Sequence, residues 1–82
     1  MYKNLAPDGR HNICGRQIAA LRKARAPKMS QRALADMLQL NGLDVDKNAV
    51  QRIESGQRFV TDIELKALAC ALGVSVEELL RV

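Results

Sequence analysis

Aromatic residues are nearly absent from this chain of 82 residues, which contains one Phe, one Tyr and no Trp. A hydrophobic core must therefore come from the aliphatic side chains among the 48% of residues that are hydrophobic, and that composition is typical of small helical bundles. A chain of this length makes one domain with a modest core and leaves little room for a second.

Cysteine and histidine are also scarce. Cys14 and Cys70 form no C-x-x-C pair and His11 stands alone, so no metal site is predicted, and we expect both cysteines to be buried free thiols. The sequence lacks a nucleophile–base set, a carboxylate pair and a phosphate-binding loop, which argues against an enzyme, a cofactor or a small-molecule ligand. It also lacks a signal pattern and an apolar run of membrane length, so we expect a cytoplasmic protein with no membrane partner.

The positive charge is unevenly distributed. The net charge is +4, but residues 1–40 hold eight Lys or Arg against two Asp or Glu, whereas residues 61–82 hold two against four. A basic half of this kind fits an electrostatic footprint on nucleic-acid phosphates. It fits a solvated basic face equally well, and charge alone does not decide between the two.

Apolar periodicity and capping residues predict an all-α protein of five helices. After an irregular arm over residues 1–12, the first helix runs from about residue 13 to 26, with Asn12 as its cap. Ser30 suits the N-cap of the second helix. The last two helices each open with a capping box, Thr61 with Glu64 and Ser75 with Glu78. The expected core comprises Cys14, Ile18, Leu21, Leu34, Ala35, Leu38, Leu65, Leu68, Ala69 and Leu72.

The third helix, over residues 46–55, has an unusual polar face. Asp46 suits its N-cap, Gly56 suits a left-handed stop, and only Val50 and Ile53 form an apolar edge. The remaining face carries amides and cations, namely Lys47, Asn48, Gln51 and Arg52. Asn and Gln pair with adenine, and Arg or Lys with guanine, so this face suits a DNA groove. The alternative is an ordinary solvated helix surface.

Four motifs in this order resemble the helix-turn-helix family of the Cro protein and phage repressors, over about residues 13–80. They are Ile18-x-x-Leu21-Arg22, Ser30-Gln31-x-x-Leu34-Ala35, Val50-x-x-Ile53-Glu54-x-Gly56 and Leu65-x-x-Leu68-Ala69-x-x-Leu72-Gly73-Val74-Ser75. The resemblance implies a five-helix bundle of the lambda-repressor type over residues 13–82, with double-stranded DNA as its partner.

The resemblance also implies roles for individual residues. It places Lys47, Asn48, Gln51 and Arg52 at base edges, and Gln31 and Arg58 at phosphates, where we also expect Lys28, Ser30 and Arg32. It further implies a structural ion pair between Arg22 and Glu54, whose loss should destabilise the fold before it changes base preference.

The chain departs from the family in the turn of the motif, because Leu38 and Val50 are further apart by about five residues than in a typical member. We expect the second helix to extend through Leu40, and Leu43 and Val45 to pack the longer connection into the core.

These observations predict a transcriptional regulator, expected to be a repressor, that occupies an operator as a homodimer on two half-sites. The acidic C-terminal helix with Leu80 and Val82 is the candidate dimer surface, although a fraying apolar terminus explains those residues nearly as well. The alternative function is a protein-interaction module on the same fold, such as an antitoxin or an adaptor that bridges regulators. Steep salt dependence would distinguish phosphate binding from an apolar protein interface.

Overall fold

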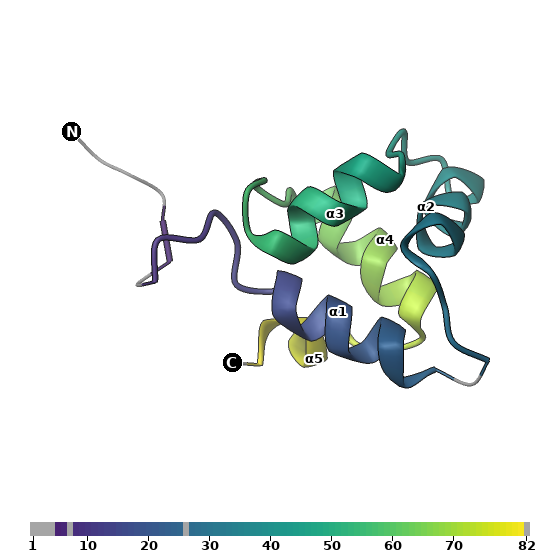
Figure 1. Ribbon diagram of the computed structural model, residues 1–82, viewed down its shortest axis with the longest axis horizontal. Helices are drawn as coiled ribbons and strands as arrows, with labels where there is room; N and C mark the ends of the chain where they lie inside the picture. Colours follow the sequence, from purple (N-terminus) through teal and green to yellow (C-terminus); the bar gives the residue numbers. More distant parts are fainter. Residues whose placement is uncertain (1–4, 7, 26, 82) are drawn as a thin grey trace.

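Five α-helices pack around a shared aliphatic core in the computed structural model of the chain, and Figure 1 shows how the helices are arranged. The structure describes residues 5–6, 8–25 and 27–81. Its helices are α1 (Gly15–Ala24), α2 (Gln31–Leu40), α3 (Lys47–Ser55), α4 (Asp62–Leu72) and α5 (Val76–Leu80), and no strand occurs among these residues. The predicted all-α fold of five helices is confirmed.

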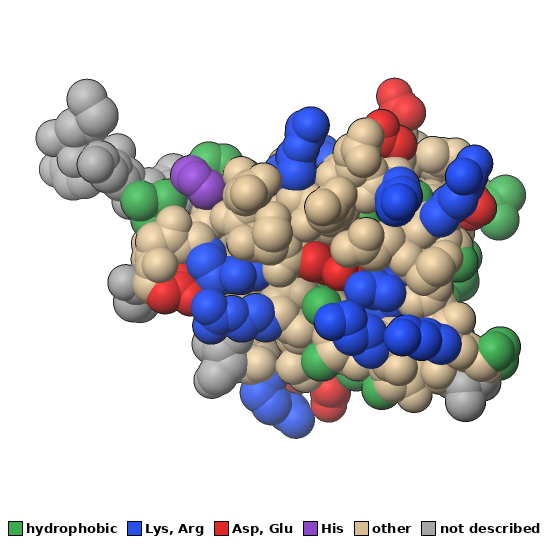
Figure 2. All heavy atoms as spheres, viewed as in Figure 1, with side chains coloured by type: hydrophobic (Ala, Val, Ile, Leu, Met, Phe, Trp, Pro, Cys, Tyr) green, Lys and Arg blue, Asp and Glu red, His purple; other side chains and the backbone are tan. Residues whose placement is uncertain are grey.

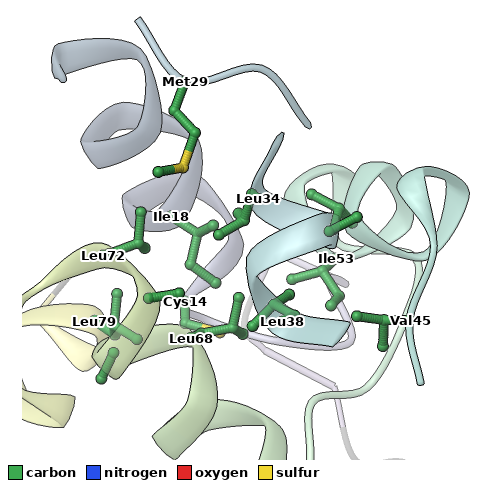
Figure 3. Close-up of a cluster of buried hydrophobic side chains, with 14 residues drawn as sticks. Cys14, Ile18, Met29, Leu34, Leu38, Val45, Ile53, Leu68, Leu72 and Leu79 are labelled. Atoms are coloured by element: carbon green, nitrogen blue, oxygen red, sulfur yellow. The ribbon is translucent and has the colours of Figure 1, made fainter. Parts of the chain in front are cut away.

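The core draws one apolar face from each helix (Figure 3). Ile18 of α1, Leu34 and Leu38 of α2, Leu68 of α4 and Leu79 of α5 are completely shielded from solvent. The predicted core positions are buried except for two, Leu21 and Leu65, which are partly buried and pack against the cluster. Complete burial of a Leu or Ile side chain contributes roughly 1.5–3 kcal/mol, so these helices are held mainly by aliphatic packing.

Side-chain caps begin α2, α3, α4 and α5 where the sequence predicts them, whereas the N-cap position of α1 is Cys14 and not the predicted Asn12. The Ser30 hydroxyl accepts from the Ala33 N–H, and an Asp46 carboxylate oxygen accepts from the Ala49 N–H. Thr61 and Glu64 form a complete capping box at α4. At α5 the box is half formed. The Ser75 hydroxyl accepts from the Glu78 N–H, but the Glu78 carboxylate pairs with Arg81 instead, with Oε1 3.4 Å from Nη1.

The first helix is shorter than predicted at both ends. It begins at Gly15, because the Asn12 side-chain oxygen accepts the Gly15 N–H at 2.8 Å and folds residues 12–14 into a turn. It ends at Ala24, because Arg25 adopts an extended backbone with ψ of 148°. Pro27 lies three positions beyond this end.

The lengthened connection between α2 and α3 is packed against the core. α2 extends to Leu40 as predicted, and residues 41–46 lead to α3. Val45 is 3% exposed, Leu43 is partly buried, and the Gln39 side-chain amide donates to the Val45 carbonyl at 2.8 Å. The inserted residues therefore have a fixed path, and the predicted packing of Leu43 and Val45 is confirmed.

The two cysteines have different environments. Cys14 is 2% exposed within the core, and burial raises the pKa of its thiol, which keeps the group neutral. Cys70 is exposed on α4, so the prediction of a buried thiol there is wrong. Its neighbours Ala69 and Ala71 are the ones that face the core.

Membrane-spanning and metal-binding features are not found within residues 5–6, 8–25 and 27–81. No helix there is long and apolar enough to cross a membrane. No group of three or more His, Cys, Asp or Glu side chains there gathers as a metal site would require.

Gly15 marks the close approach of α1 to α3. A Cβ atom placed on Gly15 would collide with the Ile53 carbonyl oxygen and lie 2.8 Å from the Asn12 side-chain oxygen. Helix propensity alone favours alanine over glycine by about 1 kcal/mol. We expect the collision to outweigh this preference for alanine, so that Gly15→Ala lowers the free energy of unfolding by about 1–2 kcal/mol in urea titrations.

Ala20, an exposed position on the same helix, provides the control. Ala20→Gly should cost about 1 kcal/mol through propensity alone. If Gly15→Ala instead stabilised the protein by a similar amount, the close approach of the two helices would be disproved.

Candidate nucleic-acid interface

The outer face of α3 is polar and open to solvent. Its apolar edge is closed, because Val50 and Ile53 are each 1% exposed, as predicted. The four predicted base-contacting residues Lys47, Asn48, Gln51 and Arg52 are all exposed. Three of them line a shallow hollow of about 290 Å³ together with Ser55 and Gln57. The structure thus brings donors and acceptors together along one helix face, in the form that base-edge recognition needs.

A buried ion pair holds α3 against α1. The Arg22 Nε donates to Glu54 Oε2 at 2.7 Å and its Nη2 donates to Oε1 at 2.9 Å, a bidentate arrangement. The two side chains are only 8% and 7% exposed. Arg22 also donates from Nη1 to the Met29 carbonyl at 3.0 Å, which ties the loop before α2 to the same guanidinium.

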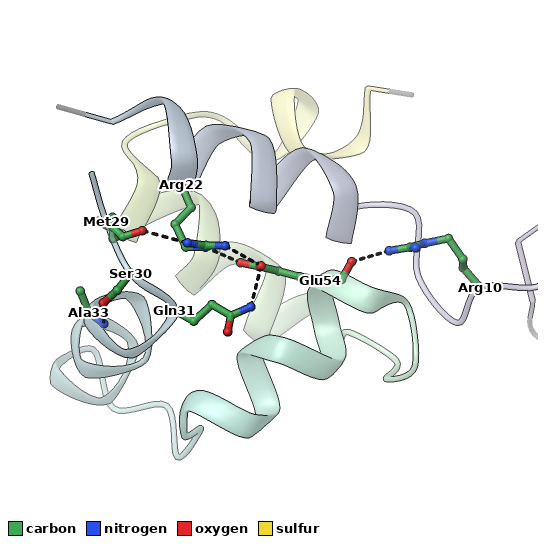
Figure 4. Close-up of polar contacts among 7 residues, drawn as sticks. All are labelled: Arg10, Arg22, Met29, Ser30, Gln31, Ala33 and Glu54. Carbon is green, nitrogen blue, oxygen red and sulfur yellow. Dashed lines mark hydrogen bonds and ion pairs between the residues drawn. The ribbon is translucent and has the colours of Figure 1, made fainter. Parts of the chain in front are cut away.

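Gln31 links α2 to this pair. It is the first residue of α2, and its Nε2 donates to Glu54 Oε1 at 3.0 Å (Figure 4). Glu54 therefore accepts hydrogen bonds from α1 and α2 together, which fixes the last turn of α3 between them. The Gln31 amide has a second N–H that this bond does not use.

Cations surround the entrance to this brace. An open groove of about 570 Å³, which we call the basic groove, runs between the end of α1, the start of α2 and the start of α3. It is lined by Arg22, Lys23, Lys28, Ser30, Gln31, Arg32 and Lys47. Figure 2 shows Lys and Arg side chains spread over this side of the molecule, with fewer acidic ones among them. The predicted phosphate contacts other than Arg58 thus share one groove.

Arg58 differs from the other predicted phosphate contacts. Its Nη2 donates to Glu64 Oε2 at 2.6 Å, and Glu64 also accepts from the Thr61 N–H in the α4 capping box. The Arg58 side chain is 33% exposed. Its guanidinium is thus part of the structure that starts α4 and lies apart from the basic groove.

The sequence interpretation missed two residues beside α3, Arg10 and Asn12. It assigned residues 1–12 to an irregular arm, of which residues 1–4 and 7 lie outside the described part. The described residues of that segment are irregular, but Arg10 and Asn12 donate to carbonyls at the end of α3. Asn12 carried a local signal as a helix cap. Arg10 carried none, because its partner Glu54 lies 44 positions away.

Comparison with known proteins agrees with this architecture. The profile of the helix-turn-helix family matches residues 18–79. This range begins within α1, ends within α5 and includes the whole of α2, α3 and α4. A similar solved structure is the restriction-modification controller protein C.AhdI from Aeromonas hydrophila, at 35% sequence identity and a TM-score of 0.67. The match covers 80% of this chain and 89% of that one. No match was found among curated proteins.

Proposed function

Because the chain belongs to the Cro/C1-type helix-turn-helix family of DNA-binding transcription regulators, we propose that it places α3 in the major groove of an operator. There it regulates transcription by occupying the site, acting as a repressor where that site covers a promoter. One observation carries the proposal: an exposed polar face on α3 lies next to a groove lined by cations.

Base recognition falls to the exposed residues of α3. Asn48 and Gln51 each offer an amide that pairs bidentately with adenine, and Arg52 offers a guanidinium that pairs with guanine. Lys47 stands at the first position of α3 and also lines the basic groove, so it lies between the base-reading face and the phosphate-binding one.

Phosphate binding falls to the basic groove and the start of α2. The Ser30 hydroxyl and carbonyl accept from Ala33 and Leu34, so the N–H groups of Gln31 and Arg32 stand at the open end of the helix. Such an end attracts anions, and Lys28 and the Arg32 side chain add charge beside it. Arg58 contributes from the loop after α3, where its guanidinium bridges the Glu64 carboxylate and a phosphate.

One domain of this size makes few base contacts, so we propose a homodimer on two half-sites about one DNA turn apart. The α5 surface supports this proposal, because Val76 is 36% exposed and Leu80 is 39% exposed there. Val82, the other residue predicted for this surface, lies outside the described residues.

Selection of bound duplexes from a random library, near physiological salt, tests the proposal. Promoter fragments from restriction-modification genes belong in the same experiment, because C.AhdI is a restriction-modification controller protein. A recovered palindrome with half-sites one turn apart would support a dimeric operator-binding protein. Recovery of nothing above background would favour the protein-interaction module instead.

Arg52 and Gln31 should separate base recognition from phosphate binding. Arg52→Ala should relax the preference at one position of each half-site by about 10-fold, because one base-edge contact is worth about 1–3 kcal/mol. Gln31→Ala should weaken binding to all sequences alike, because it removes a phosphate contact while the bidentate bond from Arg22 still holds Glu54 in place. Equilibrium binding to the selected operator and to single-base variants measures both effects.

Two controls accompany this pair. Lys66→Ala removes an exposed cation of α4 and should leave the preference unchanged. Urea unfolding of Gln31→Ala corrects for its lost bond to Glu54. Equal losses at every sequence for both variants would contradict the division between base and phosphate contacts.

A further inference from the structure

The segment just before α1 lies against the C-terminal turn of α3. The Arg10 Nη2 donates to the Glu54 carbonyl at 2.6 Å, and the His11 N–H donates to the Gly56 carbonyl at 2.8 Å. The Asn12 Nδ2 donates to the carbonyls of Ile53 at 3.0 Å and Arg58 at 2.7 Å. We call Arg10, His11 and Asn12 the α3 clamp.

Two of these bonds, to the carbonyls of Ile53 and Glu54, reach the last turn of α3, and the other two reach the loop that follows it. The last four carbonyls of an α-helix have no partner within the helix, and together they form its negative end. Part of this need is met locally, because the N–H groups of Gly56 and Gln57 donate to Ile53 and Arg52. The clamp supplies further donors, and Arg10 brings a positive charge to the negative end of α3.

Close packing accompanies the hydrogen bonds. Gly56 has a φ of +82°, and a Cβ atom on it would lie 2.7 Å from Cζ of Arg10, so the guanidinium lies directly over the glycine. The His11 ring meets Phe59 edge to face, with ring centroids 4.7 Å apart. The clamp therefore touches both the end of α3 and the loop that follows it.

Glu54 is consequently held at two points. Its carboxylate accepts from Arg22 and Gln31, while its backbone carbonyl accepts from Arg10 on the other side (Figure 4). Asn12 adds a direct link between helices, since its oxygen accepts from Gly15 at the start of α1 while its nitrogen donates to the end of α3. Both ends of that amide are used, which fixes its orientation.

We propose that Arg10 and Asn12 are positioning residues that set the orientation of α3 and so determine its base specificity. The proposal rests on the proposed function of α3. The clamp precedes residues 18–79, so it lies outside the part of the chain that matches the helix-turn-helix profile. Base readout needs side chains placed to within about 0.5 Å, whereas phosphate attraction by the basic groove tolerates looser geometry. Loosening the clamp should therefore reduce specificity more than it reduces general DNA affinity.

Charge-matched variants test this proposal. Arg10→Gln removes the Glu54 bond and one positive charge, whereas Arg16→Gln removes the same charge from a side chain that is 72% exposed and paired with Asp8. The measured quantity is the ratio of Kd for a scrambled duplex to Kd for the selected operator, at fixed salt. We expect this ratio to fall about tenfold in Arg10→Gln and to stay unchanged in Arg16→Gln.

Asn12 allows its two contacts to be separated. Asn12→Asp keeps the oxygen that accepts from Gly15 but removes the donor to Ile53 and Arg58, whereas Asn12→Ala removes both contacts. We expect both variants to lower the ratio by a similar factor. A purely structural role would raise Kd equally for both duplexes, through the folded fraction, and an unchanged ratio in Arg10→Gln and Asn12→Asp would overturn the proposal.

Amide hydrogen exchange of the free protein keeps the clamp testable without an operator. In Asn12→Asp, amide exchange in the last turn of α3 should be about tenfold faster than in the parent protein, while exchange in α4 stays the same. In Arg16→Gln, exchange in α3 should remain as in the parent protein. Equal exchange in α3 of all variants would overturn the clamp itself. Failure of the parent protein to select any duplex, with faster α3 exchange in the variants, would instead refute the proposed function.

Discussion

Replacing Glu54 with alanine is expected to lower the free energy of unfolding by about 3–5 kcal/mol, because it leaves the Arg22 charge buried without its partner. Both side chains are more than nine-tenths buried, at 8% and 7% exposed, so water cannot replace the lost carboxylate. A small domain has roughly 5–15 kcal/mol of stability in total, so a large share would be lost. Urea unfolding followed by circular dichroism measures the change.

Two comparisons identify the buried charge as the cause. Asp8→Ala breaks the exposed Arg16 pair and should cost less than about 1 kcal/mol. The double variant Arg22→Met with Glu54→Leu removes both charges and should recover most of the stability lost in Glu54→Ala. If Glu54→Ala cost no more than Asp8→Ala, the Arg22–Glu54 pair would have to be solvated in solution.

The same variants bear on how the fold and DNA binding are connected. Glu54 does not line the hollow on α3 or the basic groove, yet it accepts from both α1 and α2. The double variant should therefore fold while lacking the brace that holds the end of α3. Its base preference then shows how much of the recognition depends on this brace, separately from stability.

Local chemistry explains the parts of the fold that the sequence predicted well. Ser30, Asp46 and Thr61 each cap a helix through bonds to a residue three positions away, so the pattern is visible in a short stretch of sequence. The extension of α2 to Leu40 and the burial of Val45 followed from the separation of Leu38 and Val50, which is longer than in the family that the chain resembles. Boundaries were less accurate, because the start of α1 depends on how Asn12 folds back on Gly15.

Long-range contacts explain the parts that the sequence could not predict. Arg10 bonds a carbonyl 44 positions away, and backbone carbonyls carry no sequence signal. The sequence also carried no sign of the ion pair between Arg58 and Glu64, because the predicted role of Glu64 was only that of a cap. Cys70 was expected to be buried because of its residue type, whereas the register of α4 turns it outward.

Raising the salt concentration from 50 to 200 mM is expected to weaken operator binding by about ten-thousandfold. The basic groove of each subunit presents the exposed cations Lys23, Lys28, Arg32 and Lys47, so a dimer would neutralise about eight phosphates. Each neutralised phosphate releases condensed counterions, which makes the affinity fall linearly on a double-logarithmic plot. Fluorescence anisotropy of a labelled operator over a salt series measures the slope.

The slope should change in steps that identify the cations responsible. Lys28→Gln should reduce its magnitude by about one per copy, and hence by about two in a dimer, whereas Lys66→Gln on α4 should leave it unchanged. An apolar protein interface predicts a shallow slope that neither substitution alters. The exposed polar face of α3 is compatible with either partner when considered alone, and it is the neighbouring basic groove that makes DNA the better assignment. A shallow slope in the parent protein would remove that support, and the polar face of α3 would then be better explained as a protein-binding surface.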